Sequence, residues 1–481
     1  MLTLAEAIDN HAQTRPSAVA LIASATGART TYAELAARAA KLAGALHTRF
    51  GVGHGDRVAV LAWGDVHTFE LLVACSILGA ALTPLNLRLS EHELGPVIDR
   101  CDPKVLLRDA AHADRAPAAT VPGASYPLPD DAEPATRRGT LDDALVMLFT
   151  SGTTGLPKGA LLPARAIAAN AESTLLAWAL GAEDVALVDA PLFHTGGLNV
   201  LATPLLYAGG TVVVAPRFDA ERSGALLVDH GCTVSFGVPT MLERFVANGI
   251  VDRSKVRLWV TGGAPCPHSL LDAFAKKGVG LVQGFGMTEC GPNCFRPLDG
   301  MAKGAVGVPT KDLEMRLVDE AGKDVTPGEP GELLLRGPQL FAGYFRDPVA
   351  TAAAVRDGWL HTGDVLRATP EGWFVAGRKK EMFITGGENV YPAEVEAALM
   401  AHPAVAEAAV VSVPDAKWGE AGVAYVLTRA EATPEVLRGF LRERIASYKV
   451  PRTIHVEADL PRTASNKIDK RALLERARQK S

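Results

Sequence analysis

The stretch Leu148–Leu161, LFTSGTTGLPKGAL, decides how the rest of the chain is interpreted. An apolar run typical of a strand leads into a loop of glycines and small hydroxyl residues, and Lys158 follows. Glycine allows φ > 0, and such a loop can surround phosphate oxygens with N–H and O–H donors while a lysine adds positive charge. The Walker A spacing is absent, because Gly159 follows Lys158 where that motif has Ser or Thr. A plain linker would not need this order of residues, so we predict a polyphosphate-binding loop.

Further motifs lie on the C-terminal side of this loop. In QGFGMTE (283–289) the glycines allow close approach of a ligand, Thr288 offers a hydroxyl, and Glu289 is an oxygen ligand suited to Mg²⁺. A Thr-Glu pair by itself is more often a helix cap. The other motifs are PLFHTGGL (191–198), GGAPCP (262–267), GWLHTGD (358–364), the segment 377–396 and PRTASNKIDK (461–470).

Taken together, these motifs make the chain resemble the adenylate-forming superfamily, which includes acyl-CoA and aryl-CoA synthetases, peptide-synthetase adenylation domains and firefly luciferase. The resemblance covers essentially the whole chain, and the motifs stand in family order. It implies a two-step reaction in which a carboxylate attacks the α-phosphorus of MgATP and a thiol then displaces AMP from the acyl-adenylate. ATP, Mg²⁺ and, as the thiol co-substrate, coenzyme A are therefore expected.

The resemblance implies a nucleotide site that draws on most of the motifs. Asp364 would accept the ribose hydroxyls and Arg378 would contact ribose and phosphate, although without the resemblance Asp364 is a loop cap and 378–380 a solvated basic run. The implied magnesium ligands are Thr154 and Glu289. The implied ATP- and AMP-binding residues are Thr150, Ser151, Gly152, Thr153, Thr154, Lys158, Gly263, Ala264, Pro265, Gly284, Phe285, Gly286, Met287, Thr288, Asp364, Arg378 and Lys467.

Lys467 in the tail motif would bridge the substrate carboxylate and the α-phosphate, because a cation offsets the repulsion between two anions. Without the resemblance it is a solvated tail lysine, and His194 is a structural histidine. The family usually has Gly before this lysine; Asn466 stands here, and Asn also tolerates left-handed geometry, so we expect the loop to persist. The implied catalytic residues are Lys467, His194, Thr288 and Glu289.

The acyl pocket implied by the resemblance is built mainly of apolar or small residues. It offers no cation to match a second carboxylate, which favours an aromatic (hydroxycinnamate- or benzoate-type) or a medium-to-long-chain fatty monocarboxylic acid. The implied pocket residues are His194, Leu198, Phe236, Val238, Pro239, Gly262, Gly284, Gly286, Met287, Pro292 and Asn293.

Lys380 occupies the family's hinge position, about which a small C-terminal domain turns between the two steps. Lys467 would then serve adenylation, and the loop 386–388 would serve thioester formation. Trp418 resembles a residue that contacts coenzyme A, with a partly exposed packing aromatic as the alternative. The implied coenzyme A contacts are Gly386, Gly387, Glu388, Trp418, Lys449 and Arg452.

The order of strand-like and helical segments along the chain predicts an α/β fold followed by a smaller α+β domain. Short β-branched runs alternate with helical segments up to about residue 311, which favours layered, largely parallel sheets. We expect an N-terminal adenylation body over 1–377 with a β-rich subdomain at about 305–377, a hinge at 378–382 and a mobile cap over 383–481. The aperiodic segment 109–139 is expected to be a surface excursion, and the apolar window 71–85 a buried core helix.

Composition limits the classes of protein. With 481 residues, 48% hydrophobic residues and a formal net charge of −5, the chain is neither disordered nor collagen-like. The sequence has no basic block, so we expect no nucleic-acid partner. It shows no signal-like or membrane-spanning segment, so we expect no stable membrane insertion. Six scattered cysteines fit a reducing cytoplasm, and Cys290 and Cys294 lack a second pair at zinc spacing.

The expected partners are a small carboxylic acid, ATP and coenzyme A, with a monomer and a homodimer both open. Three other functions remain at this point: a free-standing adenylation enzyme that loads a carrier protein, a luciferase-like oxygenase, and a non-enzymatic nucleotide-binding protein. Nothing after Lys470 resembles a carrier domain, which weighs against a peptide-synthetase module.

Overall fold

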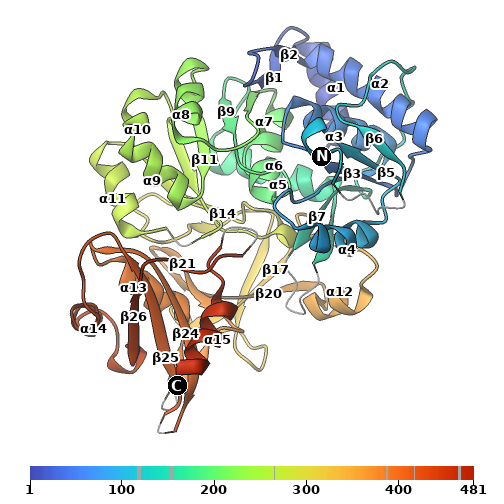
Figure 1. Ribbon diagram of the computed structural model, residues 1–481. Coiled ribbons are helices and arrows are strands. Elements are labelled where there is room, and N and C mark those ends of the chain that lie inside the picture. Colours follow the sequence, from blue (N-terminus) through green and yellow to red (C-terminus); the bar gives the residue numbers. More distant parts are fainter. Residues whose placement is uncertain are drawn as a thin grey trace.

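The computed structural model describes residues 1–115, 121–150, 157–264, 266–385, 388–416, 418–463 and 467–480. Figure 1 shows a large body, coloured blue to yellow, and a smaller C-terminal domain, orange to red, that lies below it in this view. The predicted α/β class with a small α+β C-terminal domain is confirmed.

One of the two large sheets in the described part of the body has seven strands in the order β13-β12-β11-β9-β10-β1-β2. All neighbours pair in parallel except β1 and β2. Parallel strands with helices on both faces are buried on both faces, which accounts for runs such as Thr211–Val214, TVVV. The strands are β13 (Leu281–Gln283), β12 (Leu258–Thr261), β11 (Val234–Gly237), β9 (Val185–Val188), β10 (Thr211–Val214), β1 (Val19–Ala23) and β2 (Arg29–Thr31).

The other large sheet runs in the order β18-β8-β7-β4-β3-β5-β6 among the described residues. Its β7–β8 hairpin is antiparallel and pairs Thr150 with Lys158, so the predicted phosphate loop connects two neighbouring strands. The strands are β18 (Gly343–Tyr344), β8 (Lys158–Pro163), β7 (Ala144–Thr150), β4 (Ala81–Pro84), β3 (Arg57–Leu61), β5 (Val105–Arg108) and β6 (Gly123–Ser125).

Helices cover both sheets and complete the core. The main core lies between the sheets, and a second core packs one face of the first sheet against α8, α9 and α11. Capping boxes at Thr3, Thr31 and Ser90 begin α1, α2 and α4. The helices of the body are α1 (Leu4–Thr14), α2 (Tyr32–Phe50), α3 (Val66–Leu78), α4 (Glu91–Cys101), α5 (Ala164–Trp178), α6 (Thr195–Asn199), α7 (Ala202–Ala208), α8 (Ala220–Asp229), α9 (Pro239–Ala247), α10 (Ile250–Arg253) and α11 (His268–Lys276), with 3-10 turns η1 (Ala110–His112) and η2 (Thr288–Cys290).

A β-rich subdomain follows these layers, as predicted. β16 and β17 form a hairpin, in which they pair antiparallel from Glu314↔Arg336 to Val318↔Glu332. β18 leaves this region to pair with β8, which joins the subdomain to the second large sheet. The elements are β14 (Phe295–Arg296), β15 (Val308–Pro309), β16 (Glu314–Val318), β17 (Pro330–Arg336), α12 (Pro348–Ala354), β19 (Val355–Arg356), β20 (Trp359–Thr369) and β21 (Gly372–Arg378).

The C-terminal domain has a sheet and a hydrophobic core of its own. Its strands run β23-β22-β25-β24, with β26 also on β25, and α13 and α14 cover one face. The elements are β22 (Phe383–Thr385), β23 (Glu388–Val390), α13 (Pro392–Met400), β24 (Val405–Asp415), β25 (Gly419–Thr428), α14 (Pro434–Arg442), η3 (Ser447–Lys449), β26 (Thr453–Glu457) and α15 (Lys470–Lys480). In the described part of the chain, no helix combines the length and apolarity needed to span a bilayer.

Two local predictions need correction. The window 71–85 is not one helix: α3 ends at Gly79, whose φ of +70° favours glycine, and β4 follows. The segment 109–139 is not only a surface excursion, because β6 extends the second sheet and Tyr126 is 7% exposed, with its hydroxyl against Asp65 and 2.9 Å from Thr68 Oγ1. Periodicity could not reveal these contacts, since they lie between distant segments.

Candidate active site

The topology gathers the predicted motifs at one edge of the first large sheet. Neighbouring parallel strands β9, β11, β12 and β13 end at Val188, Gly237, Thr261 and Gln283. The motifs 191–198, 262–267 and 283–289 and the pair Val238–Pro239 follow these ends directly. Ligands of open α/β sheets bind outside the carboxyl ends of the strands. The fold therefore places the predicted acyl and nucleotide segments side by side.

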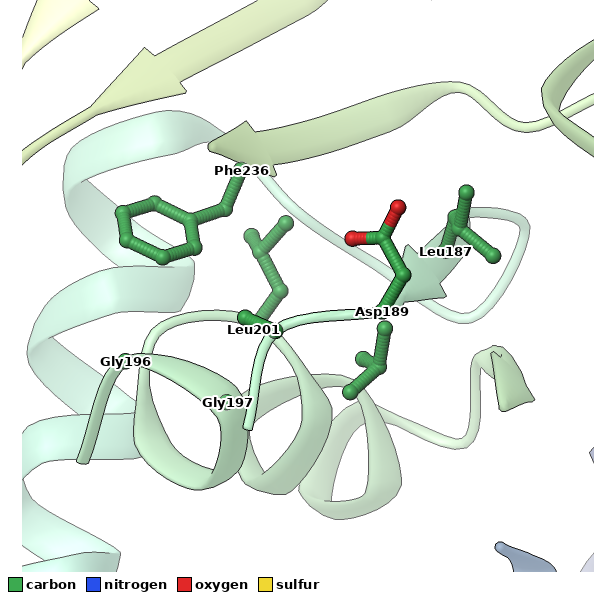
Figure 2. A pocket seen from close by; sticks show the side chains of 8 residues that line it. Leu187, Asp189, Gly196, Gly197, Leu201 and Phe236 are labelled. Carbon is green, nitrogen blue, oxygen red and sulfur yellow. The ribbon is translucent and has the colours of Figure 1, made fainter. Parts of the chain in front are cut away.

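A small cavity lies at this edge, next to the aromatic ring of Phe236 (Figure 2). A Cβ atom added at Gly196 would lie 3.2 Å from the ring, and one added at Gly262 would lie 3.7 Å from it. The two glycines thus allow the ring to stand between α6 and the loop after β12. The cavity is lined by Leu187, Val188, Asp189, Ala190, Gly196, Gly197, Leu201 and Phe236.

Asp189 is the acidic residue of this cavity, and the sequence did not single it out. It follows β9 directly and is 3% exposed, and burial raises the pKa of its carboxyl to about 6, with a hydrogen bond from Ser223 acting in the opposite direction. Its Oδ2 atom has no hydrogen-bond partner among the described residues. A charged residue at the end of an apolar strand run, VALVDAP, was the available signal.

The remaining predicted pocket residues are spread around the loop 284–293. Leu198 is buried in α6, Val238 precedes α9 and Pro239 is its first residue. Asn293 is 3% exposed, and its Nδ2 donates to Thr174 Oγ1 at 2.7 Å, so this side chain anchors the loop to α5. A Cβ at Gly286 would lie 2.3 Å from the Gly291 carbonyl oxygen, so only glycine fits this turn.

Several of the predicted ATP- and AMP-binding residues follow β12 and β13. Gly263 has a φ of +77° and the exposed Ala264 follows it, while Gly284 N–H donates to the Thr261 carbonyl at 2.7 Å. The rings of Phe285 and Phe295 meet edge to face at 5.6 Å, and Met287 packs against the main core. This part of the loop is held by its own backbone and by aromatic packing.

Glu289 is buried in η2, at 5% exposure, directly after the partly exposed Thr288. Its Oε1 accepts a 2.7 Å hydrogen bond from the hydroxyl of Tyr344, a residue that belongs to none of the sequence motifs. The same tyrosine ring lies 5.2 Å from the Lys158 ammonium. Burial and the Glu289 charge raise the pKa of Tyr344. Tyr344 thus links the phosphate-loop lysine to the predicted magnesium ligand.

Asp364 and Arg378 face each other across β20 and β21. The arginine Nε lies 2.6 Å from Asp364 Oδ1, and the aspartate is 4% exposed whereas the arginine side chain is 53% exposed. Burial raises the pKa of Asp364 to about 6, against the opposing effect of Arg378. Lys379 next to it forms an ion pair with Glu332 at 2.7 Å, and Lys380 is exposed between β21 and β22.

Lys467 comes from the C-terminal domain but lies near residues of the body. Surrounding protein atoms and then the charge of Arg378 lower its pKa, while Asp364 opposes this, although the residue keeps an exposed surface. Burial, Lys467 and Arg88 together lower the pKa of His194 to about 4. His194 is therefore neutral near pH 7, and the charge of the predicted catalytic lysine acts on both His194 and Asp364, the predicted ribose ligand.

The predicted coenzyme A residues lie on the C-terminal domain. Trp418 is 39% exposed, and the Arg452 guanidinium lies 5.5 Å from its ring and 3.1 Å from Asp415. Lys449 forms a 2.6 Å ion pair with Glu394 and its side chain is only 14% exposed, so it is less available to a phosphate than Arg452. Glu388 is exposed at the start of β23.

Several predicted residues lie outside the described residues, and their assignments stay predictions. Thr150 and Lys158 at the two ends of the phosphate loop are described, and the Thr150 hydroxyl lies 3.5 Å from the Lys158 carbonyl. The residues outside the description are Ser151, Gly152, Thr153, Thr154, Pro265, Gly386, Gly387 and Asn466.

Comparison with known proteins supports the family resemblance of the motifs. The family model described as AMP-binding enzyme matches residues 8–345, and the model for the AMP-binding enzyme C-terminal domain matches 394–467. A feruloyl-CoA synthase from Amycolatopsis sp is 39% identical over 92% of this chain and 93% of that protein. An indoleacetate–CoA ligase from Aromatoleum aromaticum is 38% identical over 98% and 97%.

Solved structures of similar proteins cover nearly the whole chain. The o-succinylbenzoate CoA synthetase from Bacillus subtilis, in complex with its acyl-adenylate intermediate, has a TM-score of 0.88 and 32% identity over 97% of each chain. ATP-bound MatB from Rhodopseudomonas palustris has a TM-score of 0.89 and 31% identity over 99% of each chain. Fold and site define an adenylate-forming enzyme. The chain belongs to the AMP-binding enzyme family, as an AMP-forming acid–thiol ligase.

Proposed function

We propose that this chain activates an aromatic monocarboxylic acid with MgATP and transfers the acyl group to coenzyme A. The observation that carries the proposal is the position of Lys467, whose charge acts on both Asp364 and His194. Asp364 is the predicted ribose ligand and His194 a predicted pocket residue, so a cation that acts on both lies near the nucleotide side and the acyl side. It can contact a carboxylate and a phosphate together.

The first half-reaction forms a bond between a substrate carboxylate oxygen and the α-phosphorus of ATP, and pyrophosphate leaves. In the second, the sulfur of coenzyme A attacks the acyl carbon, the thiol proton is lost to solvent or base, and AMP leaves. Both steps need positioning and charge stabilisation more than an enzyme nucleophile. This fits a site whose titratable groups include carboxylates, lysine, arginine, tyrosine and a neutral histidine.

Residues of this chain have separate tasks in the proposed reaction. Asp364 exchanges its contact with Arg378 for the ribose hydroxyls, and Arg378 turns to the phosphate side. Lys158 contributes positive charge at the phosphate loop. Glu289 and Thr154 would hold Mg²⁺, which when bound supplies positive charge to the phosphates; the buried oxygens of Glu289 suit this hard cation.

We infer two arrangements of the C-terminal domain (383–481) on the body (1–377), with 378–382 as the hinge around Lys380. We assign the arrangement in this structure to adenylation, because the charges of Arg378 and Asp364 act on Lys467, so this lysine lies near the predicted nucleotide site. Turning the domain would withdraw Lys467 and bring the loop 386–388 and Trp418 towards the acyl-adenylate. Gating then separates the two steps.

An aromatic acid is favoured over a fatty acid by two observations. The relatives at 39% and 38% identity are named for ferulate and indoleacetate, which are both aromatic acids. The cavity beside Phe236 is small and is lined in part by the buried Asp189, which is unfavourable for an extended alkyl chain. We also infer a cytoplasmic setting, since the six cysteines are free thiols.

The test is a panel of aromatic and aliphatic acids incubated with MgATP, with and without coenzyme A. We expect acyl-CoA and AMP from aromatic acids such as ferulate or indoleacetate, and weaker turnover of octanoate. Preference for aliphatic acids would contradict the substrate class. Pyrophosphate release with no thioester when coenzyme A is supplied would favour carrier-protein loading instead.

A further inference from the structure

Lys470 lies three residues beyond Lys467, at the first position of α15, and makes two ion pairs, one with the hinge segment and one inside the C-terminal domain. Its Nζ lies 2.5 Å from Glu381 Oε2 and 2.8 Å from Glu396 Oε1. Glu381 belongs to the hinge segment 378–382, and Glu396 belongs to α13. The Lys470 side chain therefore connects the Lys467 loop with the hinge and with α13 of the C-terminal domain.

The ion pair with Glu396 is held rigidly. Glu396 has a side chain only 8% exposed, and its Oε1 also accepts the Val410 N–H of β24 at 2.7 Å. Desolvation lowers the pKa of Lys470, but the two carboxylates outweigh it and the pKa is raised, so the lysine stays charged. A buried, hydrogen-bonded ion pair fixes the geometry of its side chains more firmly than an exposed one, because little water competes for either charged group.

The loop that presents Lys467 is closed at its base. Thr463 N–H donates to the Lys467 carbonyl at 2.8 Å, and Arg462 pairs with Ile468 as an isolated bridge. Arg462 also holds Glu407 of β24 through two contacts of 2.8 and 2.9 Å. Arg462 and Lys470 thus fix opposite ends of the loop, and Lys470 alone of the two reaches the hinge.

We propose that Lys470 is a positioning residue. Through its ion pairs with Glu381 and Glu396 it makes the hinge and the Lys467 loop move as one rigid lever. Rotation about Lys380 then brings the Lys467 ammonium to the reacting carboxylate and phosphate. This rests on the proposed function, because the lever matters only if Lys467 acts in adenylation. Glu381 lies on the distal side of Lys380, so the tether moves with the small domain and persists in both arrangements.

The tether predicts a split between the half-reactions. Lys470→Met should lower adenylation, measured as acid-dependent ATP–pyrophosphate exchange, by at least about 30-fold, since small misplacements of a catalytic group cost about 10²-fold. Thioester formation from supplied acyl-adenylate and coenzyme A should stay within about threefold, because Lys467 is withdrawn in that step. Lys470→Arg should recover most of the loss.

A second variant is needed if Lys470→Met fails to fold because the buried Glu396 has lost its charged partner. Glu381→Gln keeps the Lys470–Glu396 pair and breaks only the link to the hinge; it should lower adenylation about 5- to 10-fold with an unchanged thermal midpoint. Arg471→Gln, which removes an exposed pair with Glu475 at 3.7 Å on the same helix, is the matched control and should leave both rates unchanged.

Amide hydrogen exchange tests the tether without any turnover. The Lys467 amide, which lies 3.3 Å from Thr463 Oγ1, should exchange faster in Glu381→Gln than in the wild type and in Arg471→Gln. Equal losses in both half-reactions, or unchanged adenylation together with unchanged exchange, would overturn the proposal. If the wild type makes no acyl-adenylate from any acid, the proposed function fails, and so does the positioning role, whatever the exchange shows of the tether.

Discussion

Asp364 and Asp189 are two buried aspartates whose pKa values are both raised to about 6, yet their surroundings differ. Asp364, on the nucleotide side, has the Arg378 guanidinium at 2.6 Å. Asp189, on the acyl side, leaves Oδ2 without a hydrogen-bond partner in the described part of the chain. The raised pKa thus reflects burial in both places. The hydrogen-bond or ion-pair partner distinguishes the two carboxylates: Asp364 can exchange its partner for a ligand, whereas Asp189 lowers the stability of the fold.

The nucleotide side shows how that exchange is arranged. Glu289 is likewise buried and has Tyr344 as a neutral partner at 2.7 Å. Neutral or exposed partners can be displaced by a ligand at low cost, whereas a buried carboxylate oxygen without a partner, such as Asp189 Oδ2, carries an uncompensated cost of desolvation. We therefore expect substitutions on the nucleotide side to change activity, and substitution of Asp189 to change mainly stability.

The largest expected effect belongs to the cation that joins the two sides. Lys467→Ala should lower adenylation by about 100- to 1,000-fold, the usual cost of removing one preorganised charge-stabilising group. Acyl-CoA formation from supplied acyl-adenylate should change far less. Pre-steady-state measurement of each half-reaction checks this, and equal losses in both would remove Lys467 from its assigned step.

Asp364→Asn should come next. The amide cannot accept two ribose hydroxyls as a carboxylate does, so KM for ATP should rise about 10- to 100-fold, in line with the loss of charge-assisted hydrogen bonds. KM for the acid should hardly move. Asp189→Asn is the matched control, because it removes an equally buried carboxylate; a similar rise in KM for ATP there would break the comparison.

Asp189→Asn should instead stabilise the fold above neutral pH. The folded-state pKa of about 6 lies above the ordinary value of 3.8, so the carboxyl favours folding below about pH 4, and this contribution is lost as the pH rises through 6. The shift of about two units corresponds to an upper limit of about 3 kcal/mol. Chemical denaturation at pH 7.5 should show a gain in the free energy of unfolding that disappears near pH 4.

No gain at pH 7.5, or the same gain at both pH values, would show that a partner satisfies Asp189. Thr83→Val serves as a control for stability, because Thr83 Oγ1 is also buried without a partner among the described residues but does not ionise. Its effect on the free energy of unfolding should not depend on pH.

The smallest expected effect concerns coenzyme A. Arg452→Gln should raise KM for coenzyme A about 3- to 10-fold, as for an exposed charged contact, and leave KM for ATP unchanged. Lys449→Gln should raise it less, because the Lys449 ammonium is occupied by Glu394 at 2.6 Å. Steady-state kinetics with coenzyme A as the varied substrate distinguishes them, and a larger effect at Lys449 would reverse the assignment.

The fold class could be predicted because it depends on short stretches of sequence, in which β-branched runs alternate with helices. The site motifs could be located for the same reason, since Gly-rich segments follow the strand ends. The sequence could not predict Tyr344 beside Glu289, 55 residues away, or Lys470 beside Glu381, 89 residues away. Such pairs form only once strands and domains are packed. Asp189 was missed for a related reason, since burial at a strand end depends on which helices cover it.

In the proposed reaction, one site first forms an acyl-adenylate and then transfers the acyl group to coenzyme A. The most direct measurement is the stoichiometry of products from a single aromatic acid such as ferulate in the presence of MgATP and coenzyme A. We predict equal amounts of pyrophosphate, AMP and acyl-CoA, with the acyl-adenylate accumulating on the enzyme when coenzyme A is left out. Formation of ADP and phosphate, or AMP without a thioester across the whole acid panel, would contradict it.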